Sequence, residues 1–537
     1  MDKKINKLIN IQFGGKNKWN TLDHCGVIFP PEYIPHNTPL IYKEEKIILS
    51  PLAEEFATIY AKFIDTDYIT NKIFRKNFWN DFKKILSKDA INNIISLDDC
   101  DFSLFYNYNF KKKEEKMSIS KEEKEEIKKK RDIEEKKYKI AIVDGKEQPV
   151  GNYRIEPPGI FLGRGCNPKL GKIKHRIYPE DIIINIGKES KPPEPLKGHH
   201  WGQIIHDKSV EWLVTWKDNI SGKPKYVWLG HHSDFKANSD ILKFELARKL
   251  KKKIKIIREE NTKNLTNSDI KIRQIATALY FIDNLALRVG NEKSKDEADT
   301  VGVSSLRVEH IELKEGNIVK LDFLGKDSIR YKNSVTVSEE VFNNLKEFIE
   351  GKDKSYNLFD KINSNDLNKY LQQFMKGLTG KVFRTYNASN LFQKELKKIN
   401  IKYENYDKSD KLNILLDAFN KANAKVAILC NHQKAVSKSF GKQLDTINNQ
   451  IKKTKKLLKK AQSKEKYREK LKKLRAKKEL KMDLKTVSLG TSKVNYIDSR
   501  ITIAFMKKHN IPIDSLFSKT LQEKFRWAFD APADFKF

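Results

Sequence analysis

The spacing of apolar residues predicts a chain that combines amphipathic helices with short strands. Residues Ala53 to Ile64 repeat their aromatic side chains on one side of a helix. Shorter runs from Asp181 to Ile186 and from Trp212 to Trp216 are rich in β-branched or aromatic residues, which is typical of strands. We therefore expect a mixed α/β module between residues 150 and 233, preceded by a helical region.

The clearest local signals lie in the second half of the chain. Residues Ala278 to Arg288 form an apolar helical pattern, with Gly290 placed to end it. Apolar residues alternate from Val319 to Phe323 and again at Ile329 and Tyr331, around a turn at residues 325–327. This pattern predicts a β-hairpin with Lys326 at its tip.

Two segments are dominated by charge. Lysine and glutamate fill residues 111–139, where Ser120 and Glu123 have the spacing of a capping box. Residues 441–485 contain 18 Lys and Arg against 5 Asp and Glu, and apolar residues recur there at spacings of three and four with a break near 462–466. The break favours two helices folded back as a basic antiparallel coiled coil, and one long solvated helix is the alternative.

Composition and charge narrow the class of protein. The 537 residues allow several domains, and 39% hydrophobic residues suffice for folded cores. No apolar run approaches the length of a membrane helix, and four scattered cysteines indicate a reducing, intracellular setting. The formal charge of +35 requires an anionic partner, for which nucleic acid is the first interpretation. An acidic membrane surface is the alternative, but the basic amphipathic helix that it needs is not evident.

Several kinds of chemistry have no motif in the sequence. There is no GxxxxGK[ST] loop for ATP, no HExxH motif and no Cys/His pairing at zinc spacing. The acidic cluster at Asp98, Asp99 and Asp101 fits turn or capping duty better than metal binding. We therefore expect no required ATP or other cofactor, and no essential divalent metal.

Metal-free chemistry on a phosphodiester needs protein cations, a nucleophile and a proton donor. The candidates are Arg288, Lys326, Arg384, His432 and Tyr496. Taken singly, each has an ordinary structural explanation, such as compensation of a helix dipole, a solvated turn or a position at the edge of a core. Spacing alone indicates only a basic nucleic-acid-binding protein.

Longer strings in the chain strongly resemble the eukaryotic type IB DNA topoisomerases, from about Trp19 to Phe537. The most specific strings are EPPGIFLGRG (156–165), YPEDIIINIG (178–187), ALYFIDNLALRVGNEK (278–293), DTVGVSSLRVEHI (299–311), DFLGKDSIRY (322–331), KVFRTYNAS (381–389), VAILCNHQ (426–433) and LGTSKVNY (489–496). The order of the eight strings along the chain makes the resemblance specific.

The resemblance implies an active site made of the five candidates above. Tyr496 would attack a DNA phosphodiester to form a 3′-phosphotyrosine, while Lys326 would protonate the leaving 5′ oxygen. Arg288, Arg384 and His432 would hold the non-bridging oxygens. The cut strand would rotate and reseal without ATP, which would relax supercoils of either sign. Arg164, Lys169, Lys225, Asp327 and Asn495 would contact DNA.

The resemblance also implies a multidomain α+β fold, arranged as a two-lobed DNA clamp. The clamp would combine a mixed α/β cap, a mainly helical catalytic lobe related to tyrosine recombinases, a coiled-coil linker and a small helical C-terminal domain. The expected boundaries are an N-terminal extension (1–21), core subdomain I of the cap (22–49 and 136–233), core subdomain II with charged helices (50–135), catalytic core subdomain III (234–437), the basic linker (438–485) and the C-terminal domain with Tyr496 (486–537).

Further expectations concern partners and cell biology. The partner would be double-stranded DNA, contacted mostly through its backbone, and the protein would act as a monomer with no membrane association. Camptothecin-type inhibitors would bind at the cleaved DNA. The family's long N-terminal tail, which carries its nuclear import signals, is nearly absent. We therefore expect nuclear localisation, and a role in replication and transcription, from the family resemblance alone. A viral factory or an organelle is the alternative location. A tyrosine recombinase-like strand transferase and a non-catalytic DNA clamp remain rival functions.

Overall fold

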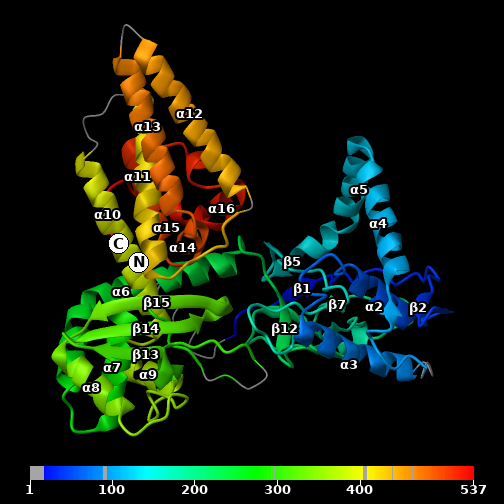
Figure 1. Cartoon of the computed structure of the whole chain (residues 1–537). Helices are drawn as coiled ribbons and strands as arrows, with labels where there is room; N and C mark the ends of the chain where they lie inside the picture. The colour runs from blue at the N-terminus through cyan, green and yellow to red at the C-terminus, as the bar shows by residue number, and fades with distance from the viewer. Residues whose placement is uncertain are drawn as a thin grey trace. The chain divides into compact units, whose positions relative to one another are not determined.

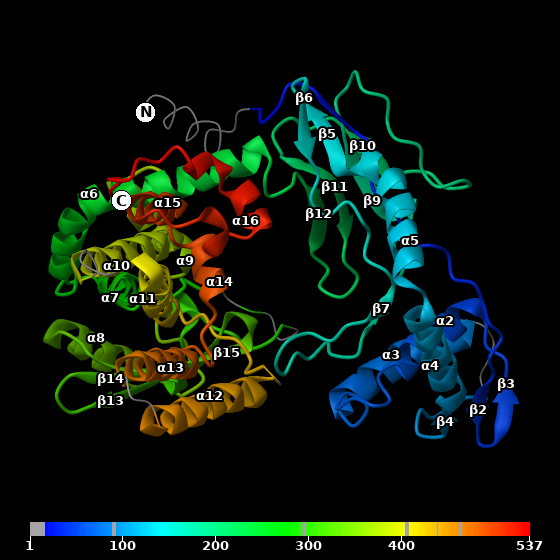
Figure 2. The same cartoon turned by 90° about the horizontal axis from the view of Figure 1, so that it is seen from above.

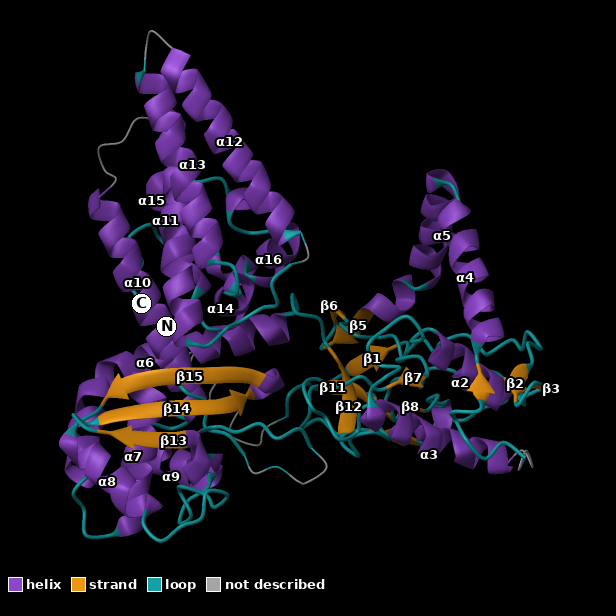
Figure 3. Cartoon of the chain, in the orientation of Figure 1, coloured by secondary structure: helices purple, strands orange, loops and turns teal. Residues whose placement is uncertain are grey.

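The computed structural model describes residues 17–88, 93–291, 293, 297–402, 408–437, 439–460 and 464–537. The chain divides into two compact units, the first formed by residues 1–236 and 293–299, and the second by residues 237–292 and 300–537. Both units combine helices with small sheets (Figure 1, Figure 3). The mixed α/β, multidomain character expected from the sequence is therefore present.

One half of the first unit is an aromatic core under three helices, α2 (Pro51–Ala61), α3 (Lys72–Lys88) and α4 (Ser103–Ser118). The Tyr60 ring stacks on the Phe78 ring with centroids 4.1 Å apart, and both side chains are fully buried. The small antiparallel sheet β3 (Glu45–Ile47), β2 (Leu40–Tyr42) and β4 (Cys100–Asp101) borders this core. The helix predicted at residues 53–64 corresponds to α2, which begins earlier because the Ser50 hydroxyl caps it and Pro51 follows.

The other half of the first unit is built from sheets. One sheet has the order β1 (Leu22–His24), β5 (Ile140–Val143) and β6 (Lys146–Pro149), and a second has the order β10 (Gln203–Ile205), β9 (Ile182–Asn185), β11 (Trp212–Lys217) and β12 (Pro224–Trp228). In the short antiparallel pair β7 (Gly159–Ile160) and β8 (Ile173–Lys174), β7 lies within the EPPGIFLGRG string. Both predicted strand runs lie in the four-stranded sheet, as β9 and β11.

The charged segment at residues 111–139 contains the end of α4 and the exposed helix α5 (Lys121–Glu134), which a 3-10 turn (Lys136–Lys139) follows. The predicted capping box is present at the start of α5. The Ser120 hydroxyl accepts a hydrogen bond from the Glu123 N–H at 3.1 Å, and the Glu123 carboxylate accepts one from the Ser120 N–H at 3.0 Å. Among the described residues of α5 none is buried, so its charged faces are solvated.

The second unit begins with the long helix α6 (Asp234–Asn264), whose first residues belong to the first unit, and with α7 (Ile270–Asn284). An antiparallel sheet of β13 (Ile311–Lys314), β14 (Ile318–Gly325) and β15 (Ile329–Thr336) follows. Val319, Leu321 and Phe323 of β14 are buried, as the alternation predicts. The helices α8 (Glu339–Ile349) and α9 (Ser364–Phe374) pack against α7.

The remaining helices bring distant segments together around α10 (Gly380–Lys402) and α11 (Lys408–Leu429), which pack against each other. The helix α14 (Leu489–Asn495) packs on α11, and α15 (Ser499–His509) packs on α10. The short helix α16 (Lys519–Lys524) precedes the C-terminus (Figure 2). This packing places the end of α14 beside the ends of α7 and α11.

The basic segment at residues 441–485 contains α12 (Phe440–Lys460) and α13 (Glu465–Asp483), which lie side by side and run in opposite directions (Figure 1). The preference for two helices over one long helix is therefore confirmed. Ile447 and Leu471 are buried, and the lysines of both helices are mostly exposed. The residues 461–463 at the predicted break lie outside the described residues.

The predicted end of the apolar helix is wrong. The helix α7 ends at Asn284, and Ala286, with φ of 49°, takes the left-handed conformation that was expected of Gly290. The segment after α7 leaves the helix because it forms hydrogen bonds with a distant part of the chain. The Arg288 carbonyl accepts from the Val303 N–H at 2.9 Å. Gly290, with φ of 89°, then passes so close to Gly302 that a Cβ would lie 2.6 Å from its Cα. Arg288 therefore lies past the end of the helix, in a segment without regular secondary structure, where it does not compensate a helix dipole.

Candidate active site

Arg384 lies on α10 and is almost completely buried, with 3% of its surface exposed. One of its Nη atoms donates to the carbonyl of Ala286 and the other donates to the carbonyl of Cys430 at 3.1 Å. Its Nε has no hydrogen-bond partner among the described residues. The guanidinium thus joins the ends of α7 and α11 while one of its donors remains available.

Arg288 and Lys326 line the same small hollow as Arg384. The hollow has a volume of about 30 Å³, close to that of one water molecule, and its walls also include Cys430. Burial first, and then the positive charge of Arg384, hold the pKa of Arg288 below its ordinary value. Two partly desolvated guanidinium groups side by side repel each other, so an anion bound between them would be stabilised.

Lys326 occupies the tip of the β14–β15 hairpin, as the sequence predicts, and its side chain is exposed. The next two residues, Asp327 and Ser328, have φ values of 67° and 56°. Gly325 pairs with Ile329, so only residues 326–328 form the turn. This tight turn fixes the backbone of Lys326, which lines the hollow.

His432 follows the end of α11 in a Schellman arrangement. Asn431 is left-handed with φ of 52°, its N–H donates to Ile428, and the His432 N–H donates to Ala427 at 2.8 Å. The imidazole is buried, its Nδ1 lies 2.6 Å from the Ser492 hydroxyl, and its Nε2 has no partner among the described residues. Burial, followed by the charges of Arg384 and Arg288, lowers the pKa of His432 to about 3. The ring is therefore neutral at physiological pH.

Tyr496 ends α14 and lies beside the same groups. Its ring stacks on the His432 ring with centroids 5.2 Å apart, and the Arg384 guanidinium lies 5.0 Å from the Tyr496 ring centroid. Burial alone would raise the pKa of the phenol, but the charges of Arg384 and Arg288 and a hydrogen bond from Arg384 outweigh it. The pKa of Tyr496 is therefore lowered, which favours the phenolate that a nucleophile needs.

The structure thus brings four of the five candidates into direct proximity, and Lys326 borders the same hollow. Two buried serines of this site escaped the sequence analysis. Ser492 contacts His432, and the Ser389 hydroxyl donates to the Tyr496 carbonyl at 2.9 Å while it accepts from the Asp498 N–H at 3.0 Å. Both serines stand within the strings quoted above, but no spacing rule distinguishes them from ordinary helix residues.

A buried ion network holds the segment that follows Tyr496. The Arg500 guanidinium donates to Asp498 at 2.8 Å and to Glu245 of α6 at 2.6 Å. Asp498 is fully buried and Glu245 is 5% exposed. Burial lowers the pKa of Arg500, but the two carboxylates raise it more, so the guanidinium stays charged. The segment after Tyr496 is therefore attached to α6 as well as to α10.

The other residues expected to contact DNA lie in two places. Asp327 adjoins Lys326, and Asn495 precedes Tyr496 with its side chain exposed. Arg164, Lys169 and Lys225 belong to the first unit, where Arg164 is exposed in a loop between two left-handed glycines.

Lys225 belongs to a local charge cluster in the first unit. Its Nζ lies 2.6 Å from a Glu156 carboxylate oxygen and 3.7 Å from Asp218. Lys174 also pairs with Glu156, and burial followed by the charge of Lys225 lowers the pKa of Lys174 to about 8. The cluster carries two lysines and two carboxylates in a small volume, so its charges largely compensate one another in the free protein.

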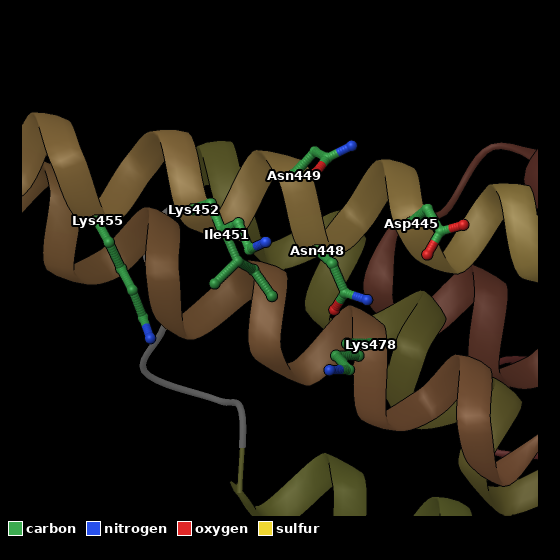
Figure 4. A pocket seen from close by; sticks show the side chains of 7 residues that line it. All are labelled: Asp445, Asn448, Asn449, Ile451, Lys452, Lys455 and Lys478. Carbon is green, nitrogen blue, oxygen red and sulfur yellow. The ribbon is translucent and has the colours of Figure 1, made fainter.

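A second, wider hollow of about 600 Å³ lies along α12 and α13 (Figure 4). Its walls combine Asp445 and two asparagines with Lys452, Lys455 and Lys478, and none of the five catalytic candidates lines it. It offers basic groups for an anionic surface and no nucleophile.

Within the described ranges, no group of three or more His, Cys, Asp or Glu side chains could hold a metal ion. No described helix is both long and apolar enough to cross a membrane.

Comparison with known proteins identifies the family. The family "Eukaryotic DNA topoisomerase I, DNA binding fragment" matches residues 17–229, "Eukaryotic DNA topoisomerase I, catalytic core" matches 232–465, and "C-terminal topoisomerase domain" matches 468–537.

Curated relatives agree along nearly the whole chain. DNA topoisomerase 1 of Caenorhabditis elegans is 46% identical over 96% of this chain and 67% of its own length. The Homo sapiens protein of that name is 43% identical over 97% of this chain and 72% of its own, and DNA topoisomerase 1 alpha of Arabidopsis thaliana is 43% identical over 97% and 60%. The chain therefore belongs to the family of eukaryotic DNA topoisomerase I, the type IB isomerases of DNA.

Proposed function

We propose that this protein cleaves one strand of duplex DNA through Tyr496 and reseals it without ATP. The observation that carries the proposal is the position of the Tyr496 phenol near two arginines, the buried Arg384 and the half-buried Arg288, whose charges lower its pKa. A buried tyrosine without a catalytic role would have a raised pKa, because burial disfavours the phenolate. The arginine pair therefore supports a nucleophilic role for this residue.

In the proposed reaction, the phenolic oxygen of Tyr496 loses its proton and attacks a backbone phosphorus. An O–P bond to the tyrosine forms on the 3′ side, and the bond from phosphorus to the 5′ oxygen breaks. Lys326 gives a proton to that leaving oxygen. The phosphodiester energy is kept in the phosphotyrosine, so the free 5′ hydroxyl can reverse the reaction and release Tyr496.

Three cationic or donor groups would stabilise the transition state. The available Nε of Arg384, the partly desolvated guanidinium of Arg288 and the unpartnered Nε2 of His432 would each donate to a non-bridging oxygen. Such donors are effective because they are already oriented and lie in a site that excludes water. Nε of Arg384 and Nε2 of His432 have no hydrogen-bond partner among the described residues, which supports their role as donors to an anionic oxygen.

We further propose that the protein encloses DNA as a two-lobed clamp, with the expected domain boundaries, and that the cut strand rotates before it is resealed. In this arrangement Arg164, Lys169, Lys225, Asp327 and Asn495 contact DNA, and the α12–α13 hairpin lies over the rotating duplex. The net charge of +35 and the lysines of the hairpin support backbone binding. A monomer of the nucleus, related in its catalytic lobe to the tyrosine recombinases and sensitive to camptothecin-type drugs, fits this proposal.

The test is relaxation of negatively and positively supercoiled plasmid in EDTA without ATP. The wild-type protein should relax both, whereas Tyr496→Phe should bind plasmid but neither relax it nor form a covalent adduct. Tyr356→Phe is a matched control, because Tyr356 is 59% exposed and lies outside the site. If the wild-type protein binds plasmid but does not relax it, the proposed cleavage is wrong and a non-catalytic DNA clamp is the function that the result supports.

A second experiment separates Lys326 from the other groups. Lys326→Ala should cleave ordinary DNA slowly, because the 5′ oxygen then leaves without a proton. A substrate with sulfur in the bridging 5′ position should restore cleavage by this variant, since a thiolate leaves without protonation. Equal defects on both substrates would show that Lys326 is not the proton donor.

A further inference from the structure

Ser492 joins the nucleophile to the imidazole beside it. Its side chain is fully buried and its hydroxyl lies 2.6 Å from Nδ1 of His432. Its carbonyl accepts hydrogen bonds at 3.0 Å from the N–H groups of both Tyr496 and Ile497. A single residue therefore holds the His432 ring with its side chain and the Tyr496 backbone with its main chain.

The backbone of His432 is fixed independently of this contact. Its N–H donates to Ala427 and its carbonyl accepts from the Ser488 N–H, each at 2.8 Å. Two residues later, the backbone N–H of Lys434 donates to the Thr486 carbonyl at 2.8 Å. Because the main chain of His432 is already held by these hydrogen bonds, the Ser492 hydroxyl acts on the orientation of the imidazole ring alone.

The protonation of the ring depends on this hydroxyl. Two guanidinium groups, Arg288 and Arg384, face the imidazole, so a third positive charge there is unfavourable and the ring carries one proton. A neutral imidazole has one N–H donor and one lone pair, and the two nitrogens have opposite roles. If the proton were on Nδ1, the lone pair of Nε2 would face any anionic oxygen bound in the site.

We propose that Ser492 is a positioning residue, whose hydroxyl donates to Nδ1 of His432 and thereby keeps the ring proton on Nε2 for a non-bridging phosphate oxygen. The proposal rests on the phosphate-binding role of His432 given above. A partner on one imidazole nitrogen commonly selects the tautomer and orients the other nitrogen, as metal-bound histidines show. Here the Ser492 hydroxyl lies 2.6 Å from Nδ1, so a donor is in place at this nitrogen.

The first test reads the tautomer without DNA or activity. The protein labelled with ¹⁵N in its histidines is examined by NMR at pH 7, and the His432 signals are assigned by their loss in His432→Gln. The wild type should show a protonated Nε2 and an unprotonated, hydrogen-bonded Nδ1, as should Ser488→Ala and Ser492→Thr. Ser492→Ala should show a mixture of tautomers. A protonated Nδ1 in the wild type, or an unchanged tautomer in Ser492→Ala, overturns the proposal.

The control variants are matched to the contact. Ser488 lies four residues before Ser492, and its hydroxyl contacts only the exposed Thr491 hydroxyl, at 3.2 Å, among the described residues. Threonine at position 492 retains a hydroxyl on the same carbon. Rescue by Ser492→Thr therefore separates loss of the hydroxyl from loss of packing.

The second test measures single-turnover cleavage of a DNA duplex and, separately, its binding. Ser492→Ala should slow cleavage by about tenfold to a hundredfold, as outer partners of catalytic groups usually do, with unchanged binding. Adding Ser492→Ala to His432→Gln should cause no further loss, because the serine acts through the histidine. Independent, multiplicative losses overturn the proposal. If His432→Gln itself cleaves normally, the proposed role of His432 fails, whereas the NMR result still decides the hydrogen bond.

Discussion

Ser389 offers the most direct test of how Tyr496, the proposed nucleophile, is held. Its hydroxyl is fully buried, donates to the Tyr496 carbonyl at 2.9 Å and accepts from the Asp498 N–H at 3.0 Å. Ser389 lies on α10, five residues after Arg384, so it attaches the Tyr496 backbone to the helix that carries this arginine. The substitution Ser389→Ala removes this attachment and changes almost nothing else in volume.

The expected cost follows from the two groups that lose their partner. A buried backbone carbonyl and a buried N–H would each be left unsatisfied, at about 1–3 kcal/mol apiece. We therefore expect the free energy of unfolding to fall by about 2–6 kcal/mol, measured from the urea midpoint at an unchanged slope. Ser488→Ala, which removes a hydroxyl that contacts only Thr491 at 3.2 Å, should cost less than about 0.5 kcal/mol.

Activity should fall for the same reason. A nucleophile displaced by about 1 Å can lose about a hundredfold in rate, so cleavage and resealing by Ser389→Ala should both slow by up to this factor under conditions where it remains folded. DNA binding should be unchanged, since the serine is buried. A variant with wild-type stability and a wild-type cleavage rate would refute the idea that this bridge holds Tyr496.

Two further predictions concern the surrounding charges. Arg500→Met should lower the free energy of unfolding by about 3–5 kcal/mol, measured by urea denaturation, because the buried carboxylates of Asp498 and Glu245 lose their shared cation; a wild-type midpoint would contradict this. The pKa of His432 is about 3 in the folded protein, against an ordinary value of 6.5 that applies to the unfolded chain. Below pH 6.5 the unfolded chain therefore binds a proton at His432 that the folded protein does not bind. Stability should therefore decrease on acidification from pH 6.5 towards pH 3, by at most about 1.4 kcal/mol per pH unit from this group. Thermal unfolding of His432→Gln across this range should show a weaker pH dependence, and an equal dependence would show that His432 does not titrate in this way.

Local patterns in the sequence were sufficient for several elements. The Ser120–Glu123 capping box, the β14–β15 hairpin and the division of the basic segment into α12 and α13 depend on residues within about one or two turns of each other. The five catalytic candidates followed from strings shared with a family, because each residue type taken alone has an ordinary structural explanation. The roles of these residues remain predictions.

The tertiary structure decided what no local rule reaches. The apolar pattern continues to Arg288, yet α7 ends at Asn284, because the segment after it binds residues near Val303 and passes against Gly302. Local helix propensity cannot anticipate a partner that approaches from elsewhere in the chain.

The same reason explains the electrostatics of the site. Arg384 binds the Ala286 carbonyl across 98 residues, His432 contacts Ser492 across 60, and Ser389 contacts Tyr496 across 107. The lowered pKa values of Tyr496 and His432 arise only when these segments meet, because they depend on burial and on charges a few ångströms away. The sequence by itself determined the residue types and the local elements, whereas the packing of α10, α11 and α14 determined which of them meet and how they are charged.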